Sequence, residues 1–116
     1  KSQLYWLNAQ LKEMDNDVEI ILMHIPFAVD PAKTVTDNML FAALSAYPSV
    51  KLILGGHHHK NLVTDFPVKG NTKIIQVQTG AFAADTSNWR QIKLTKDKIL
   101  VSLPGKTENE VVIPVR

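Results

Sequence analysis

The sequence feature that most constrains this chain is a short apolar run that stops at two glycines and three histidines, Leu52-Ile53-Leu54-Gly55-Gly56-His57-His58-His59-Lys60. The apolar run is too short for a helix and is bounded by residues that break regular structure, so it predicts a buried strand. The glycines allow the backbone to turn sharply, or to approach another group closely, where a larger residue would clash. We therefore expect a sheet strand that ends in a loop bearing histidines.

The histidines follow the carboxyl end of this strand, which is the edge of an open α/β sheet where ligands bind. His57 and His59 are two residues apart, so in an extended backbone their rings leave on the same side. Because neutral imidazole binds transition metals well, this spacing predicts a pair of metal ligands. The alternative is a solvated surface loop. An affinity tag is excluded, since the run lies inside the chain and within a strand pattern.

A second apolar run, residues 18–23, ends at His24, and Pro26 prevents a central strand from continuing there. A nearly continuous apolar run is typical of a strand covered on both faces, as in a layered α/β sandwich. All four histidines of the chain thus follow two strands that we expect to be neighbours in one sheet. This predicts that His24 converges with His57 and His59. A lone core or surface histidine is the alternative for His24.

Helical periodicity precedes each of these strands. Apolar residues recur at helical spacing in residues 2–14, and the aromatic pair Tyr5 and Trp6 beside that stripe is expected to pack. Residues 36–47 predict a second helix, capped by Thr36 or Asp37. Because this helix lies between the strands, the strands should be parallel and connected with a right-handed crossover. The residues expected on its inward face are Met39, Leu40, Ala43, Leu44 and Tyr47.

The second half of the chain reads as short strands joined by turns. The strands expected there are residues 61–68, 73–78, 89–95 and 99–103, with Ile92 and Leu94 facing inward. Turns at this spacing predict antiparallel hairpins. Residues 106–116 are expected to form an edge strand or a tail. The fold class is therefore α/β with a mixed sheet that ends in antiparallel hairpins.

Composition narrows the class of partner. The chain has 116 residues, which is one domain or less, and its 13 basic and 11 acidic residues give a net charge of +2. No cluster of lysine and arginine indicates nucleic-acid binding, and no apolar run approaches the length of a membrane span. The absence of cysteine excludes thiolate chemistry and cysteine-bound zinc, and it assigns no compartment. The chain begins at Lys1, so a processed or truncated product is expected.

Three histidines with an open position would suffice for one zinc ion that activates water. Two-metal phosphoryl transfer needs further ligands, including bridging carboxylates. The seven aspartates lie in expected turns or caps, and none is spaced as a pair near the histidines. From the residues alone, the ligand set for a two-metal site is incomplete.

Four segments together resemble the C-terminal half of a calcineurin-like metallophosphoesterase, and the resemblance extends over residues 3–103. The segments are Gln3-x-x-Trp6-Leu7, Met23-His24-Ile25-Pro26, Gly55-Gly56-His57-His58-His59 and Gln78-Thr79-Gly80-Ala81-Phe82. The resemblance implies a four-layer αββα sandwich, with two sheets between outer helices and a binuclear metal site. It also implies hydrolysis of a phosphate ester, either a monoester or a diester.

The resemblance further implies a role for each histidine. His24 and His57 would bind one ion, and His59 would bind the other. His58 occupies a variable position of the family motif, where it would either contact phosphate or face solvent, and the solvent-facing interpretation is favoured. The parent protein would hold two divalent or trivalent ions, such as manganese, iron or zinc, and this chain would be at most partly occupied.

The N-terminal motifs of the family do not occur in this chain. Asp-x-His, Gly-Asp-x-x-Asp and Gly-Asn-His-Asp/Glu, which supply the bridging aspartate and other ligands, are all missing. Residues 1–116 are therefore expected to be a partial domain that is inactive alone. The expected partners are the missing N-terminal half and a phosphate ester substrate, and exposed apolar faces predict a homodimer or other self-association of the fragment.

Two other interpretations stay open. One is a non-catalytic metal-binding or interaction module that uses His24, His57 and His59 for a single ion. The other is a structural domain without metal. Neither the substrate nor the preferred metal follows from the sequence, because binding sites of this kind accept several metals.

Overall fold

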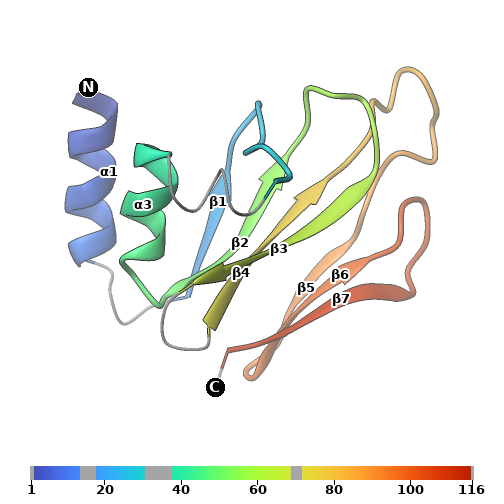
Figure 1. Cartoon of the computed structure of the whole chain (residues 1–116). Helices are drawn as coiled ribbons and strands as arrows, with labels where there is room; N and C mark the ends of the chain where they lie inside the picture. Colours follow the sequence, from blue (N-terminus) through green and yellow to red (C-terminus); the bar gives the residue numbers. More distant parts are fainter. Residues whose placement is uncertain (1, 14–17, 31–37, 69–71, 116) are drawn as a thin grey trace.

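The computed structural model describes residues 2–13, 18–30, 38–68 and 72–115 and arranges them in three layers (Figure 1). Two helices cover one face of a four-stranded sheet, and a three-stranded sheet covers the other face. The elements are α1 (Ser2–Glu13), β1 (Glu19–Leu22), α3 (Met39–Ser45), β2 (Val50–Gly55), β3 (Leu62–Val68), β4 (Thr72–Gln78), β5 (Ile92–Leu94), β6 (Lys98–Ser102) and β7 (Asn109–Pro114).

The larger sheet is mixed, with strand order β1-β2-β4-β3. β1 and β2 are parallel, with Ile20 opposite Leu52, and β2 and β4 are also parallel, with Leu52 opposite Ile75. β3 returns antiparallel to β4 at the far edge. The parallel pairing of β1 and β2, with α3 between them in the chain, confirms the expected parallel arrangement. It places the carboxyl ends of β1, β2 and β4 along the same edge of the sheet.

The smaller sheet consists of β5, β6 and β7 in that order, all antiparallel. β7 lies at the edge of this sheet, so the last apolar run of the chain is an edge strand over residues 109–114. Within the described residues, no helix covers the outer face of this sheet. Three of the four layers of the expected sandwich are therefore present in the described part of the chain.

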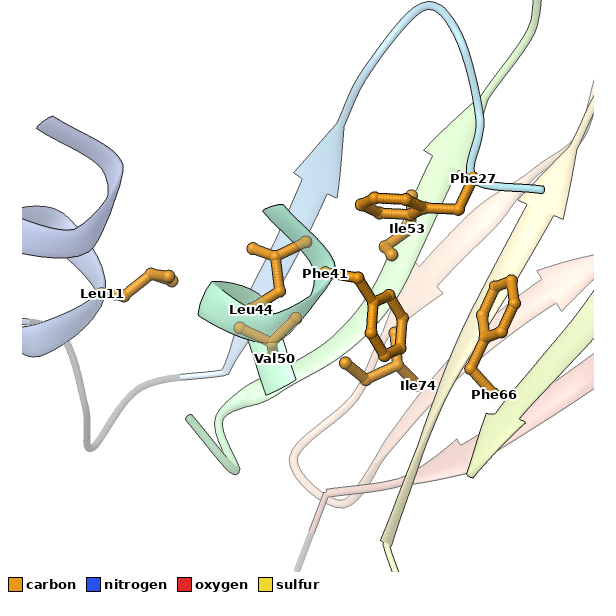
Figure 2. Packing of buried hydrophobic residues seen from close by; sticks show 8 residues of the cluster. All are labelled: Leu11, Phe27, Phe41, Leu44, Val50, Ile53, Phe66 and Ile74. Carbon is orange, nitrogen blue, oxygen red and sulfur yellow. The ribbon is translucent and has the colours of Figure 1, made fainter. Parts of the chain in front are cut away.

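Two hydrophobic clusters join the layers. The cluster between the helices and the mixed sheet contains an aromatic series in which Phe41 of α3 meets Phe27 and Phe66, with ring centroids 5.3 and 5.2 Å apart (Figure 2). The second cluster lies between the sheets. It consists of Leu52, Ile75, Val77, Ile99, Val101, Val111 and Ile113. Since alternate residues of β2 and β4 enter opposite clusters, both faces of these strands are buried, and for β2 its continuous apolar run predicts this.

Three expectations about side-chain direction are wrong. Met39 is 77% exposed, whereas Phe41 is fully buried, because Met39 is the first residue of α3 and precedes the turn that contacts the sheet. Leu40, Leu44 and Tyr47 pack against the core as expected. Ile92 and Leu94 are exposed rather than inward, since β5 is a short edge strand. Tyr5 and Trp6 are also exposed and do not pack in the described chain. The expected caps Thr36 and Asp37 lie outside the described residues.

In the part of the chain that is described, none of the helices has the length and apolar character needed to cross a membrane.

Candidate metal centre

His24 and His57 meet at the carboxyl edge of the mixed sheet. The backbone beyond β1 stays paired with β2, because Met23 N–H donates to the Leu54 carbonyl at 3.0 Å and Gly56 N–H donates to the His24 carbonyl at 2.9 Å. This pairing brings His24 Nε2 to 3.1 Å from His57 Nδ1, with the rings edge to face at a centroid distance of 5.0 Å. The expected convergence is therefore present for this pair.

The separation of 3.1 Å has two chemical interpretations. One imidazole can donate a hydrogen bond to the other, provided that their tautomers are complementary. The same separation suits two nitrogens on one metal ion. With metal–nitrogen bonds of about 2.1 Å, ligand nitrogens lie about 3.0 Å apart at a right angle and about 3.4 Å apart at the tetrahedral angle. The distance between the two nitrogens thus matches that of two ligands of one ion.

The loop that carries the other histidines is not extended. β2 ends at Gly55, and His57 and His59 have positive φ angles of 66° and 55°. His58 N–H donates to the Gly56 carbonyl at 2.7 Å, which closes a tight turn. The premise that His57 and His59 project from an extended backbone is therefore wrong. Left-handed backbone at two non-glycine residues is uncommon, and histidine is among the residues that tolerate it best.

His58 and His59 are both exposed on this turn. The His58 ring lies against the edge of the His57 ring, with centroids 5.0 Å apart. Across the described ranges, no three histidine, aspartate or glutamate side chains gather into a group that could hold a metal ion. The described chain therefore brings together two of the three expected ligands, and His59 does not join them in one group.

A hollow of about 390 Å³ opens beside the histidine pair. Its lining residues are Leu22, Met23, His24, Leu54, Gly55 and Gly56. Gly55 is needed here for close packing, since a Cβ at this position would lie 3.2 Å from the Cβ of Pro26. The two strand ends and the turn of Pro26 thus form one compact wall of the site.

The adjoining loop after β4 is held by asparagines that the sequence did not single out. Asn61 accepts a hydrogen bond from Gly80 N–H at 3.0 Å and donates to Asn88 Oδ1 at 2.9 Å. Asn88 in turn donates to the Ala81 carbonyl at 2.9 Å. A Cβ at Gly80 would lie 2.7 Å from Asn88 Nδ2, so a larger residue would displace the Asn88 side chain from these hydrogen bonds. Asn61 lies two residues after His59, and this closeness to the histidine turn was the sequence signal that could have identified it.

Comparisons with known proteins match the chain to phosphoesterases. No family model matches the chain. A 3',5'-cyclic-nucleotide phosphodiesterase of Nostoc sp. is 35% identical over 63 residues, which are 49% of this chain and 24% of that protein. A dimetal phosphatase from Danio rerio has a similar structure, with a TM-score of 0.74 and 19% identity over 100% of this chain and 38% of that one.

The chain thus spans about a quarter of the curated relative and 38% of the solved phosphatase. The phosphatase shares the mixed α/β fold over the whole of this chain, as expected from the sequence. Both matches are consistent with a fragment of a calcineurin-like metallophosphoesterase, which confirms the resemblance drawn from the four sequence motifs.

Proposed function

We propose that this chain provides part of the metal site of a phosphoesterase that hydrolyses phosphate esters. In this proposal His24 and His57 bind one ion together and His59 binds a second. The observation that carries it is the 3.1 Å approach of His24 Nε2 to His57 Nδ1 at neighbouring strand ends. A dimetal phosphatase of the same fold and a related cyclic-nucleotide phosphodiesterase support the same class of chemistry.

The residues present fit a metal ion only in part. Two imidazoles at the right separation can hold a divalent ion, but a catalytic site normally has at least three protein ligands and an open position. Among the described residues, no carboxylate joins the pair to complete such a group. The remaining ligands must therefore come from outside this group, and we expect the chain alone to bind metal weakly and to be inactive.

The histidines of this chain would serve to hold and orient the site. When bound, the ions would supply Lewis-acid activation of water and of a phosphoryl oxygen. His24 and His57 fix one coordination position each, because both strand ends are hydrogen-bonded to one another. His58 is exposed beside His57, where it would either face solvent or contact the phosphate group of a substrate.

The free edge of β1 is where we propose that the rest of the domain binds. β1 is the outermost strand of the mixed sheet, and Leu22 on it is 75% exposed. A groove of about 480 Å³ runs between this strand and the helices, and one of about 370 Å³ lies between it and the second sheet. A further strand from the same domain would cover both grooves and bring ligands next to His24.

The module interpretation is the second candidate. It is favoured by the fact that, within the described residues, only a histidine pair rather than a larger ligand group is assembled. In that case the chain would bind a single ion and need no further half. The two proposals differ in whether any extended form of the chain hydrolyses phosphate esters.

The test combines metal binding with hydrolysis. Zinc and manganese binding is measured by calorimetry on the chain and on His24→Ala, His57→Ala, His59→Ala and, as a matched control, His58→Ala. Hydrolysis of p-nitrophenyl phosphate and of bis(p-nitrophenyl) phosphate is measured with manganese on the chain alone and on a form joined to the segment that carries the missing motifs.

We expect the joined form alone to be active and His59→Ala to abolish its activity. His24→Ala and His57→Ala should each remove metal binding by the short chain, whereas His58→Ala should retain it. If neither form hydrolyses either ester while the short chain binds one ion, the module interpretation replaces the phosphoesterase. If His24→Ala and His57→Ala bind metal as the unmodified chain does, the proposed site is wrong.

A further inference from the structure

We infer that Gln76 is a positioning residue that holds His24 where His57 can reach it. The inference rests on the proposed function in one respect, namely that the histidine pair binds metal. Gln76 lies two residues before the end of β4 and is fully buried, although its neighbours along the strand are apolar. A buried carboxamide needs partners for both its donor and its acceptor, so its contacts indicate its role.

Both partners of Gln76 belong to one residue. Phe27 N–H donates to Gln76 Oε1 at 2.8 Å, and Gln76 Nε2 donates to the Phe27 carbonyl at 3.0 Å. These two hydrogen bonds reproduce the pairing that two facing residues make in an antiparallel ladder. The side chain therefore substitutes for a strand at a place where the backbone of residues 24–27 forms a turn.

The turn is anchored at both of its ends. At the first end, the His24 carbonyl accepts a hydrogen bond from Gly56 N–H. At the other end, the Gln76 side chain makes two hydrogen bonds with the Phe27 backbone. Pro26 packs over Gly55 between them, which carries the chain from β1 across β2 towards β4. Figure 2 shows Phe27 beside Ile53 of β2, and both residues belong to the same buried cluster.

The Phe27 ring alone cannot fix this turn. The ring is buried and makes an edge-to-face contact with Phe41. This contact holds the ring in the core, but it does not set the direction of the Phe27 backbone N–H and carbonyl. The two hydrogen bonds to Gln76 set the orientation of the Phe27 backbone, three residues beyond His24. Only a side chain with a donor and an acceptor at this reach supplies both bonds, which excludes leucine and glutamate as equivalents.

Metal affinity and amide exchange together test this role in the full chain. Gln76→Leu keeps the size but removes both hydrogen bonds, and Gln76→Glu keeps only the acceptor. Val77→Ala is the matched control, because Val77 is equally buried on β4 but faces the second sheet. Zinc affinity is measured by calorimetry, and exchange of the Phe27 amide proton is followed by NMR without metal.

We expect Gln76→Leu to weaken zinc binding about tenfold, as loss of outer-shell support typically does. Gln76→Glu should show a smaller loss of zinc affinity. Exchange of the Phe27 amide should be much faster in Gln76→Leu and less affected in Gln76→Glu, which keeps the acceptor of that hydrogen bond. Val77→Ala should bind zinc as the unmodified chain does, even where it unfolds at lower denaturant concentration. If Gln76→Leu fails to fold, the comparison of Gln76→Glu with Val77→Ala decides.

Two results would overturn the inference. The first is unchanged zinc affinity in both Gln76 variants while His24→Ala abolishes binding, which would leave the proposed metal site intact. The second is an equal loss of affinity in Val77→Ala, which would reduce Gln76 to general support of the fold. If His24→Ala itself leaves zinc affinity unchanged, the proposed function fails, and Phe27 exchange in the Gln76 variants still reports whether the turn is held.

Discussion

Arg90 shows how much of this small structure depends on a single polar side chain. It is only 4% exposed. Its guanidinium donates to Thr79 Oγ1 at 3.1 Å, to the carbonyls of Ser102 and Gln78 at 3.0 and 3.3 Å, and to Glu110 at 2.6 Å. These acceptors belong to both sheets, so one planar group with several donors links the end of β4 to β6 and β7.

Replacing Arg90 should therefore destabilise the chain strongly. We expect Arg90→Met to lower the free energy of unfolding by about 2 to 4 kcal/mol, because it leaves buried carbonyls and the Glu110 carboxylate without their hydrogen-bond donor. Arg90→Lys should be intermediate, since one ammonium cannot reach all four acceptors. Urea denaturation followed by circular dichroism measures this. The exposed Lys93→Met is the control, and an equal effect in both would contradict the assignment.

Asp85 offers a pH-dependent contact at the same scale. Its carboxylate accepts hydrogen bonds from the backbone N–H and the hydroxyl of Ser87, at 2.9 and 2.7 Å, and these bonds lower the pKa of Asp85. A lowered pKa means that the contact stabilises the folded state above the ordinary aspartate value of about 3.9. That contribution is lost as the pH falls through the lower folded value.

The expected outcome is local protection that depends on pH. Exchange of the Ser87 amide proton, measured by NMR and corrected for intrinsic rates, should be slower in the unmodified chain than in Asp85→Ala at neutral pH. The two should converge as the pH falls through the lowered pKa of Asp85 in the folded chain and the carboxylate becomes protonated. A difference that persists unchanged at lower pH would show that the carboxylate charge is not involved.

At the scale of elements, α3 is short and depends on its cap. The helix has seven residues, and the Asn38 side chain accepts a hydrogen bond from Phe41 N–H at 3.0 Å. Asn38→Ala should lower the free energy of unfolding by about 1 kcal/mol. Met39→Ala, at an exposed position of the same turn, should change it by less than about 0.5 kcal/mol. Thermal denaturation of both variants provides the comparison, and equal effects would argue against the cap.

Elements proved easier to predict than the faces they present. Continuous apolar runs predicted both strands, but burial on two faces holds for β2 alone, since β1 is an edge strand and its Leu22 is 75% exposed. The inward face of α3 was predicted correctly for Leu40, Leu44 and Tyr47 and wrongly at its start, where Met39 is exposed. The helix begins three residues later than expected, and periodicity does not locate such a boundary.

The candidate site was predictable in its position but not in its geometry. The ends of parallel strands meet at one sheet edge, so the approach of His24 to His57 followed from topology. The left-handed angles of His57 and His59 did not, because histidine carries no strong signal for that conformation. Gln76 escaped attention for a related reason: its partner Phe27 lies 49 residues away, beyond any local pattern.

At the scale of the whole molecule, β1 forms an edge of the mixed sheet that pairs with no further strand among the described residues. Natural proteins usually protect such edges with charge, proline or a covering segment. Leu22 and Trp6 instead expose apolar side chains beside this edge. The chain alone should therefore associate with itself when no other segment covers β1.

Leu22→Lys tests this expectation. In sedimentation velocity, the unmodified chain should show a weight-average mass that rises with concentration, and Leu22→Lys should shift it towards the monomer. Val112→Lys adds the same charge at an exposed position of β7 and should leave the association unchanged. A monomeric unmodified chain, or an equal effect of both lysines, would contradict association through β1.

The register of the sheets also determines the order in which the chain can fold. β5, β6 and β7 pair through local hairpins, whereas Glu19 of β1 must find Val50 of β2 across the α3 connection. Closing that longer loop costs more chain entropy than closing a hairpin does, and this cost precedes the stabilising contacts. The parallel pairing should therefore form late. The two histidines lie beyond this pairing, so we expect their approach to be one of the last events in folding.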